Sequence, residues 1–172
     1  MTTLPPHDIA RLIQASAAAL RAELDGLSED LLRFQPGAGE WCAKEVIGHL
    51  IEAERRGFAG RIRVLLVDSS EPALEGWDPD EVSRARHDAD REAKELLAEF
   101  STLRASSVDL VSGLQPRDFA RAGVHPKVGR LTIGDIAHEW VHHDRNHLAQ
   151  IMKNVQTYVW PSMGAAQKFS AP

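Results

Sequence analysis

The chain has 172 residues, of which 43% are hydrophobic and 26% charged, as in ordinary globular proteins. Its formal net charge of −5 and its scattered basic residues argue against nucleic-acid binding, which usually requires a basic face. No apolar stretch approaches the roughly 20 residues needed to cross a bilayer, and the single cysteine allows no intrachain disulfide. We therefore expect one soluble, cytoplasmic domain over residues 1–172, with no signal peptide.

Helical periodicity predicts two helices in the first part of the chain. The first covers residues 7–25, follows two prolines, and is stopped by Gly26. The second covers residues 43–67, where apolar side chains recur every three or four positions. The next ten residues, 68–77, form a loop that is long for a helix hairpin. Such a loop can carry the chain along the molecule and allows a crossover topology.

A third helix is predicted to begin at Asp78, because an aspartate is a favoured N-cap and Pro79 suits the first helical position. Apolar spacing continues this helix to Leu114. Residues 115–130, rich in proline and glycine, are predicted as a loop.

The fourth helix begins at Thr132, with Asp135 three residues on as in a capping box, and extends to about Asn154. The tail beyond Tyr158 is expected to add one short turn or helix. Strand signals are weak throughout. The fold class predicted is all-α: a four-helix bundle with a long crossover loop between helices two and three.

Four histidines occur close together in the fourth helix, as two pairs four residues apart. A helix advances about 100° per residue, so His143 and His147 fall at about −20° and 20° when Ile136 is set at zero. That places both at or within the apolar face. His138 and His142 fall at about 200° and 240°, on the polar side. Two inward imidazoles one turn apart either hydrogen-bond to neighbouring groups or bind one metal ion together.

His49 decides between these alternatives. It lies at the margin of the apolar stripe of the second helix, which has few other inward polar groups. A third imidazole that faces the pair from another helix completes a three-histidine site with an open coordination position. The sequence therefore predicts a divalent-metal site formed by His49, His143 and His147. Zinc, nickel, iron and copper all suit these ligands.

For other polar residues near the motif, the sequence indicates a role less clearly. Glu139, at about −60°, is a fourth ligand, a group that orients an imidazole, a catalytic acid or base, or a surface acid. Cys42 precedes His49 by seven residues, about 10 Å along the helix, and is expected at the helix entry rather than at the metal. The remaining polar candidates are expected to be solvated, the arginines with a further option of binding an anion: Asp144, Asn146, His7, His87, His125, Arg55, Arg56, Arg61 and Arg63.

Two motifs resemble those of a known superfamily. The run from Trp41 to Leu50, WCAKEVIGHL, resembles the second-helix motif of the DinB-like (damage-inducible, YfiT-type) proteins. The run from His143 to Ile151, HDRNHLAQI, resembles their last-helix motif, and residues 125–132 resemble the loop before it. Cys42 departs from the pattern, because relatives usually carry serine or threonine there and a thiol caps a helix poorly.

The resemblance implies a four-helix bundle, often a homodimer, with a metal held by three histidines that correspond to His49, His143 and His147. It also implies a function. Some relatives transfer low-molecular-weight thiols to small electrophiles in detoxification or stress responses, and others are isomerases. We therefore expect a metal-dependent thiol S-transferase. The alternatives are a metal-dependent hydrolase or isomerase, for which Glu139 is the one candidate acid or base, and a non-catalytic, stress-related bundle stapled by its metal.

Overall fold

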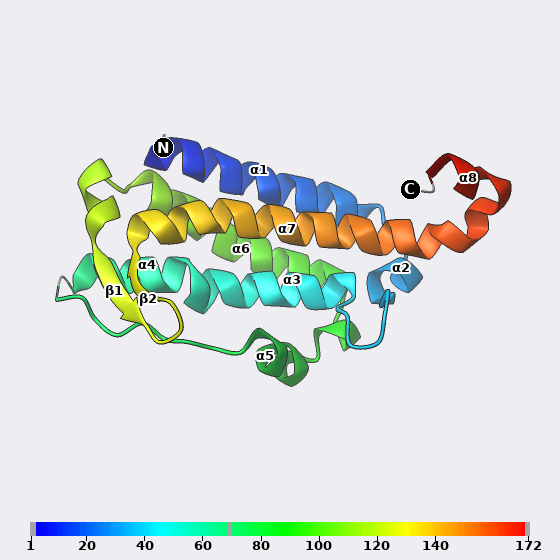
Figure 1. Ribbon diagram of the computed structural model, residues 1–172, viewed down its shortest axis with the longest axis horizontal. Helices are drawn as coiled ribbons and strands as arrows, with labels where there is room; N and C mark the ends of the chain where they lie inside the picture. Colours follow the sequence, from blue (N-terminus) through cyan, green and yellow to red (C-terminus); the bar gives the residue numbers. More distant parts are fainter. Residues whose placement is uncertain (1–2, 69, 171–172) are drawn as a thin grey trace.

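The computed structural model describes residues 3–68 and 70–170, and four long helical segments dominate it (Figure 1). The first is α1, and the third and fourth are α6 and α7. The second is built of three consecutive pieces: α3, a π-helical turn η1, and α4. The helical elements are α1 (Pro6–Asp25), α2 (Glu29–Arg33), α3 (Ala43–Glu52), η1 (Ala53–Gly57), α4 (Ala59–Val67), α5 (Pro79–Arg86), η2 (Asp88–Asp90), α6 (Ala93–Ser112), η3 (Pro116–Ala120), α7 (Ile133–Val159), η4 (Trp160–Ala166) and α8 (Gln167–Ser170).

The chain crosses over between α4 and α6, as the long loop predicted. In Figure 1, the segment after α4 returns along the whole molecule through α5 before α6 begins. The second and third long helices therefore run in the same direction, and α1 and α7 run opposite to both. The predicted all-α four-helix bundle with a crossover is confirmed.

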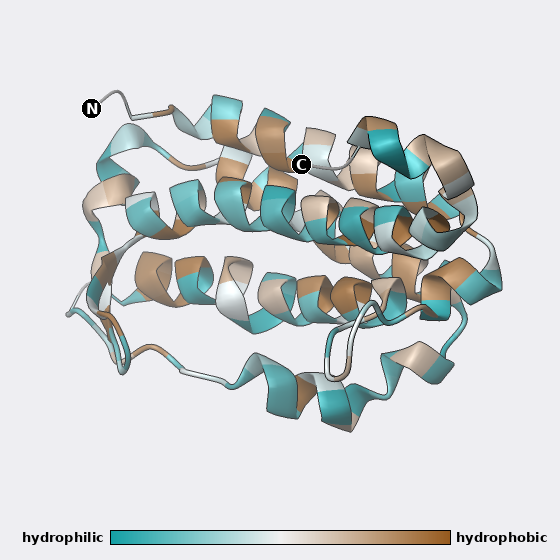
Figure 2. Ribbon diagram, turned by 45° about the vertical axis from the view of Figure 1, so that its right-hand side comes forward, coloured by the Kyte–Doolittle hydropathy of each residue, from teal (hydrophilic) through white to brown (hydrophobic). Residues whose placement is uncertain are grey.

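In Figure 2, hydrophobic residues (brown) recur along the long helices on the sides turned toward one another, and hydrophilic residues (teal) dominate the outward sides. One apolar cluster joins α1, α4 and the first half of α7, with Ile13, Ile62 and Trp140 fully buried. A second cluster, around Leu50, Leu96 and Ile151, joins the end of α1 to α2, α3, α6 and the second half of α7. Their burial removes apolar surface from water, which stabilises a fold by about 25 cal/mol per Å².

Three predicted helix ends are formed as expected. The Asp78 carboxylate accepts hydrogen bonds from the backbone of Asp80 and Glu81, as an N-cap does. Thr132 and Asp135 form a reciprocal capping box, with distances of 3.0 Å in both directions. At Cys42, the Glu45 carboxylate accepts the backbone N–H at 2.9 Å, so α3 begins there without a hydroxyl cap.

Three local predictions were wrong. The third helix is not continuous from Asp78, because α5 ends at His87, which has a left-handed φ of 52°, and α6 begins only at Ala93. The predicted loop 115–130 contains an antiparallel hairpin, β1 (Ala122–His125) and β2 (Gly129–Thr132). The fourth helix continues beyond Asn154 to Val159 before the tail turns back.

Among the described residues, no helix combines the length and the apolar character that a bilayer crossing requires.

Candidate metal centre

Helix α7 supplies two inward histidines because its apolar face passes through them. Ile136, Trp140 and Ile151 are buried on that face, and His143 and His147 lie between them, half-buried and one turn apart. Their rings are 4.4 Å apart, centroid to centroid. Both side chains lie on the inward side of α7, where their helical angles place them.

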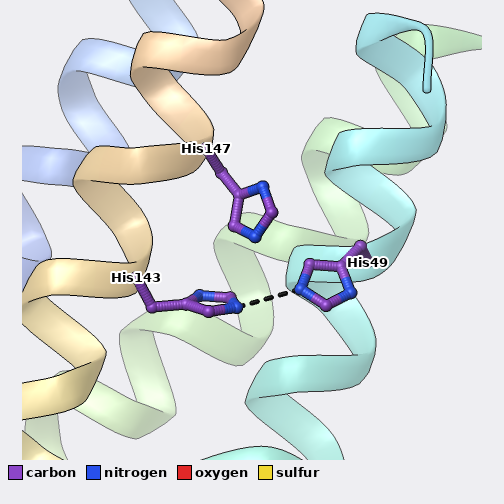
Figure 3. Close-up of side chains that lie close together, drawn as sticks. All are labelled: His49, His143 and His147. Carbon is purple, nitrogen blue, oxygen red and sulfur yellow. Dashed lines mark hydrogen bonds between the residues drawn. The ribbon is translucent and has the colours of Figure 1, made fainter. Parts of the chain in front are cut away.

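His49 faces this pair from α3 and is 8% exposed. Its Nε2 lies 2.9 Å from Nε2 of His143, and its ring centroid lies 4.6 Å from that of His147. Figure 3 shows the three rings converging from α3 and α7 on one small space. One ligand atom from each histidine lies within 4.8 Å of the other two, so the three form a group that could hold a metal ion.

Hydrogen bonding orients the third ring. His147 Nδ1 donates to the side-chain oxygen of Gln150 at 2.8 Å, which leaves Nε2 with its lone pair free. Nδ1 of His49 and Nδ1 of His143 are buried, and neither has a partner among the described residues. Buried polar atoms without partners are costly, so this cluster is held in place for a reason other than its own stability.

The cluster favours neutral imidazoles. Burial, assisted by the neighbouring His147, lowers the pKa of His49 to about 3. Burial and the charges of His147 and His49 lower the pKa of His143 to about 2. The pKa of His147 is also lowered, chiefly by burial. A metal ligand must be unprotonated, so near neutral pH no proton has to leave before binding.

The donor set fits a divalent transition metal. Zinc–nitrogen bonds of about 2.0–2.1 Å in a tetrahedral site place two ligand nitrogens about 3.3 Å apart. The observed separations, 2.9 Å for one pair and at most 4.8 Å overall, bracket that value. Three neutral nitrogens suit zinc, nickel and iron alike.

Aromatic side chains enclose the cluster. The ring centroid of Trp41 lies 4.9 Å from that of His49. The ring centroid of Trp77, from the crossover segment, lies 5.6 Å from that of His49. Phe58 makes an edge contact with His143 at 5.0 Å. Phe58 is buried, whereas both indoles are half-exposed. The two tryptophans therefore border the cluster with rings that are partly exposed to solvent.

A buried ionic network lies behind the cluster. Arg104 of α6 donates to both carboxylate oxygens of Asp144, at 2.6 and 3.0 Å, and to Glu54 at 2.6 Å. Ser107 also donates to Glu54, and Arg104 donates to the Ile13 carbonyl. The π-helical turn η1 carries Glu54, and Asp144 follows His143 directly. The network thus joins α1, α6 and both helices that carry histidines.

This network corrects the expectation that Asp144 is solvated. Its side chain is fully buried, and burial raises its pKa while Arg104 lowers it. A signal was present in the sequence, since Asp144 falls at about 80° on the helix, in the middle of the apolar arc. Arg104 likewise follows Phe100 by four residues and continues an apolar stripe. Side chains at such positions must be paired, which predicts a partner but not its identity.

The other histidines stay outside the cluster. His142 is exposed, as predicted. His138 is not on a wet face: it is half-buried, accepts the backbone N–H of Leu4 at 3.1 Å and contacts Phe119. His125 lies in the hairpin beside Arg61, and their side chains are 3.0 Å apart.

Glu139 and Cys42 do not reach the histidines. The Glu139 side chain is exposed on α7, one turn before His143. It lies near enough to Arg61 to raise the pKa of that guanidinium, although burial lowers it more. Burial raises the pKa of the Cys42 thiol to about 11, so it is an inert side chain at the start of α3. Neither belongs to the group of convergent ligand atoms.

Comparison with known proteins gives matches over most of the chain. A family model described as the DinB superfamily matches residues 12–151. YuaE from Bacillus subtilis is 25% identical over 153 residues, covering 78% of this chain and 88% of that protein. OB0782 from Oceanobacillus iheyensis, named as a candidate metal-dependent hydrolase, is 24% identical over 134 residues, covering 78% of this chain and 76% of that protein.

One solved structure has the same fold. YfiT from Bacillus subtilis, described as a probable metal-dependent hydrolase with an unusual four-helix bundle topology, superposes with a TM-score of 0.81. The match covers 90% of this chain and 88% of YfiT, at 19% sequence identity. At that identity the likeness establishes the fold, including its crossover.

Proposed function

The chain belongs to the DinB superfamily, and from this premise we propose that His49, His143 and His147 together bind one divalent metal ion. One observation carries the proposal. Three neutral imidazoles, one buried and two half-buried, present their nitrogens from two helices to a single space, and the Nδ1 atoms of His49 and His143 have no hydrogen-bond partner among the described residues. The names of OB0782 and YfiT, each as a metal-dependent protein, support it.

We further propose that the centre is catalytic and transfers a low-molecular-weight thiol to a small electrophile. When bound, a divalent ion with three histidine ligands supplies an open position and lowers the pKa of a thiol or water that occupies it. The packing of the helices in the bundle keeps the three histidines in position. Trp41 and Trp77 flank the approach and limit the water that can enter beside the reactants.

A thiol nucleophile suits this site because no carboxylate of the described residues belongs to the convergent group. A nucleophile that loses its proton on coordination needs no positioned general base. In the transfer, the sulfur forms a bond to the electrophilic carbon, the leaving group departs with the bonding electrons, and the thiol proton goes to solvent.

Hydrolysis is the second candidate, favoured by the names of OB0782 and YfiT. Isomerisation is a related alternative. Both need a group that moves a proton, and Glu139, one turn from His143, is the residue of α7 that could provide it. General acid–base catalysis contributes about 10²–10⁴-fold. Glu139→Gln should therefore lower a hydrolytic rate at least a hundredfold and leave a thiol transfer almost unchanged.

The test is a paired assay of the zinc- and nickel-loaded protein. One arm contains a low-molecular-weight thiol with a model electrophile, and the other contains an activated ester without thiol. We expect thiol-dependent turnover that is lost in His143→Ala and retained in His142→Ala, the exposed neighbour. Equal rates for the wild type and His143→Ala in both arms would exclude a catalytic role for this centre.

A further inference from the structure

Four arginines follow the metal-site residues of α3 along η1 and α4, and three of them have an ordinary setting. Arg55 donates to Glu52 at 3.0 Å and to Glu99 at 2.6 Å. Arg56 forms an ion pair with the other carboxylate oxygen of Glu52, at 2.8 Å. Arg63 is exposed, and only its Nη2 donates, to a serine hydroxyl at 3.3 Å.

Arg61 differs from these three. Its Nη2 donates to the carbonyl oxygen of Glu75 at 2.9 Å and lies 3.0 Å from Nε2 of His125, so both neighbours are uncharged. Its Nε is buried and has no partner, and no carboxylate of the described residues forms an ion pair with it. Burial lowers the pKa of this guanidinium, and Glu139 offsets only part of that effect. A half-buried cation with an unused donor is prepared to accept an anion.

An open depression of about 190 Å³ receives this side chain. Arg55, Arg56 and Arg61 line it from η1 and α4, and Leu74 and Glu75 line it from the crossover segment. Arg55 and Arg56 already pair with Glu52, Glu99 and Glu75, so Arg61 is the lining guanidinium left without a carboxylate partner. A guanidinium also matches the planar, two-oxygen geometry of a carboxylate better than an ammonium group does.

The depression is close to the histidine cluster. Arg61 follows Phe58 by three residues, and Phe58 contacts the His143 ring. Arg61 therefore lies about 4.5 Å along α4 from Phe58, the residue that contacts His143. Trp77 connects the two places, since its ring is 5.6 Å from that of His49 and 5.8 Å from the guanidinium of Arg56.

We propose that Arg61 determines specificity by binding the carboxylate of an anionic small-molecule substrate whose other end reaches the three histidines. This inference rests on the proposed function and narrows its substrate class to carboxylates. Glu139 and Glu75 are the internal acids that act on the charge of Arg61, and neither carboxylate forms a hydrogen bond with it among the described residues. A substrate carboxylate in the depression would supply the charged partner that the Arg61 guanidinium lacks.

The test uses two thiols of the same length and different charge. Binding of 3-mercaptopropionate and of 3-mercaptopropanamide to the zinc-loaded protein is measured by titration calorimetry. Hydrogen bonds to a charged group are worth about 1.5–3 kcal/mol, so the carboxylate should bind at least about tenfold more tightly. Arg61→Gln, which can still contact His125, should reduce that preference to near one. Arg63→Gln, on the same helix, should keep it.

A second measurement separates this inference from the metal proposal. The ¹H–¹⁵N signal of the Arg61 Nε–H, identified by its loss in Arg61→Lys, is followed during titration with acetate, and with acetamide or chloride as controls. A saturable shift with acetate alone supports the anion site even if neither thiol binds, an outcome that would count only against the proposed function. An unmoved signal, or an equal preference in the wild type and Arg61→Gln, overturns the role of Arg61.

Discussion

The chemistry of this molecule depends on single side chains, and in the histidine cluster burial lowers the pKa of the imidazoles. An imidazole pKa near 6.5 in the unfolded chain falls to about 3 for His49 and about 2 for His143. The unfolded chain therefore binds protons below pH 6.5 that the folded chain refuses. The contribution of these histidines to stability is fully present above that pH and is lost as the pH falls through the interval toward the folded values.

The first prediction concerns that interval. Between pH 6.5 and 4, the metal-free protein should lose up to about 1.4 kcal/mol of unfolding free energy per pH unit for each of these two histidines. His143→Gln should be less sensitive to pH by one such increment, whereas His142→Gln should match the wild type. Urea unfolding at several pH values measures this. If the unfolding free energies of the wild type and His143→Gln changed with pH in parallel, burial would not disfavour the imidazolium form of His143.

The second prediction concerns Arg104. Arg104→Met leaves the carboxylates of Glu54 and Asp144 buried without their cation, and breaking such a pair costs about 3–5 kcal/mol. Arg33→Met, which breaks a pair on the surface, should cost less than about 1 kcal/mol. Denaturant unfolding compares the two. Similar small losses would mean that the buried network does not hold the helices together.

At the scale of elements, periodicity predicted the long helices well and their interruptions poorly. The spacing of apolar residues is the same on both sides of His87, so nothing in the pattern marks the end of α5. The left-handed turn at His87 is followed by Asp88, which is buried and accepts hydrogen bonds from Arg86 and Arg91. Contacts of that kind join residues that no local pattern relates.

The same reasoning explains the π-helical turn and the hairpin. The turn η1 leaves the apolar stripe of residues 43–67 intact and shows only in the inward position of Glu54. The hairpin strands are only four residues each, and packing against the neighbouring crossover segment holds them in place. A Cβ on Gly123 would lie 2.7 Å from the Pro72 carbonyl, so the strand packs directly on the crossover segment.

The third prediction belongs to this scale. A Cβ on Gly48 would lie 1.8 Å from an oxygen of the Asp88 carboxylate, which is itself buried. Gly48→Ala should therefore displace Asp88 from its arginines and destabilise the protein by about 3 kcal/mol or more. Gly26→Ala, where the nearest atom is 3.6 Å away, should be neutral or slightly stabilising. Thermal melting of the two variants decides whether α3 and the turn after α5 depend on this contact.

For the whole molecule, the two motifs and the helix angles predicted from the sequence that His49, His143 and His147 lie together. Helical geometry makes this possible because it fixes which side chains share a face of a helix. The partner of Asp144 and the open donor of Arg61 could not be predicted so directly. Both depend on which helix lies opposite, and the crossover decides that. The homodimer implied by the resemblance stays a prediction, to be checked by sedimentation.

The fourth prediction concerns stability in the presence of metal. An ion that binds only the folded chain stabilises it by about 2.7 kcal/mol at a free concentration one hundred times its dissociation constant. Chelation should lower the melting temperature of the wild type and leave His49→Ala unaffected. A large loss on chelation without any turnover in either assay would favour the non-catalytic, metal-stapled bundle.

The most direct test of the account is the metal content of the protein after equilibrium dialysis against zinc or nickel, measured by elemental analysis. We predict about one ion per chain for the wild type and for His142→Ala, and close to none for His49→Ala and His143→Ala. A wild type that retains no metal, or single variants that retain as much as the wild type, would contradict a shared centre at these three histidines.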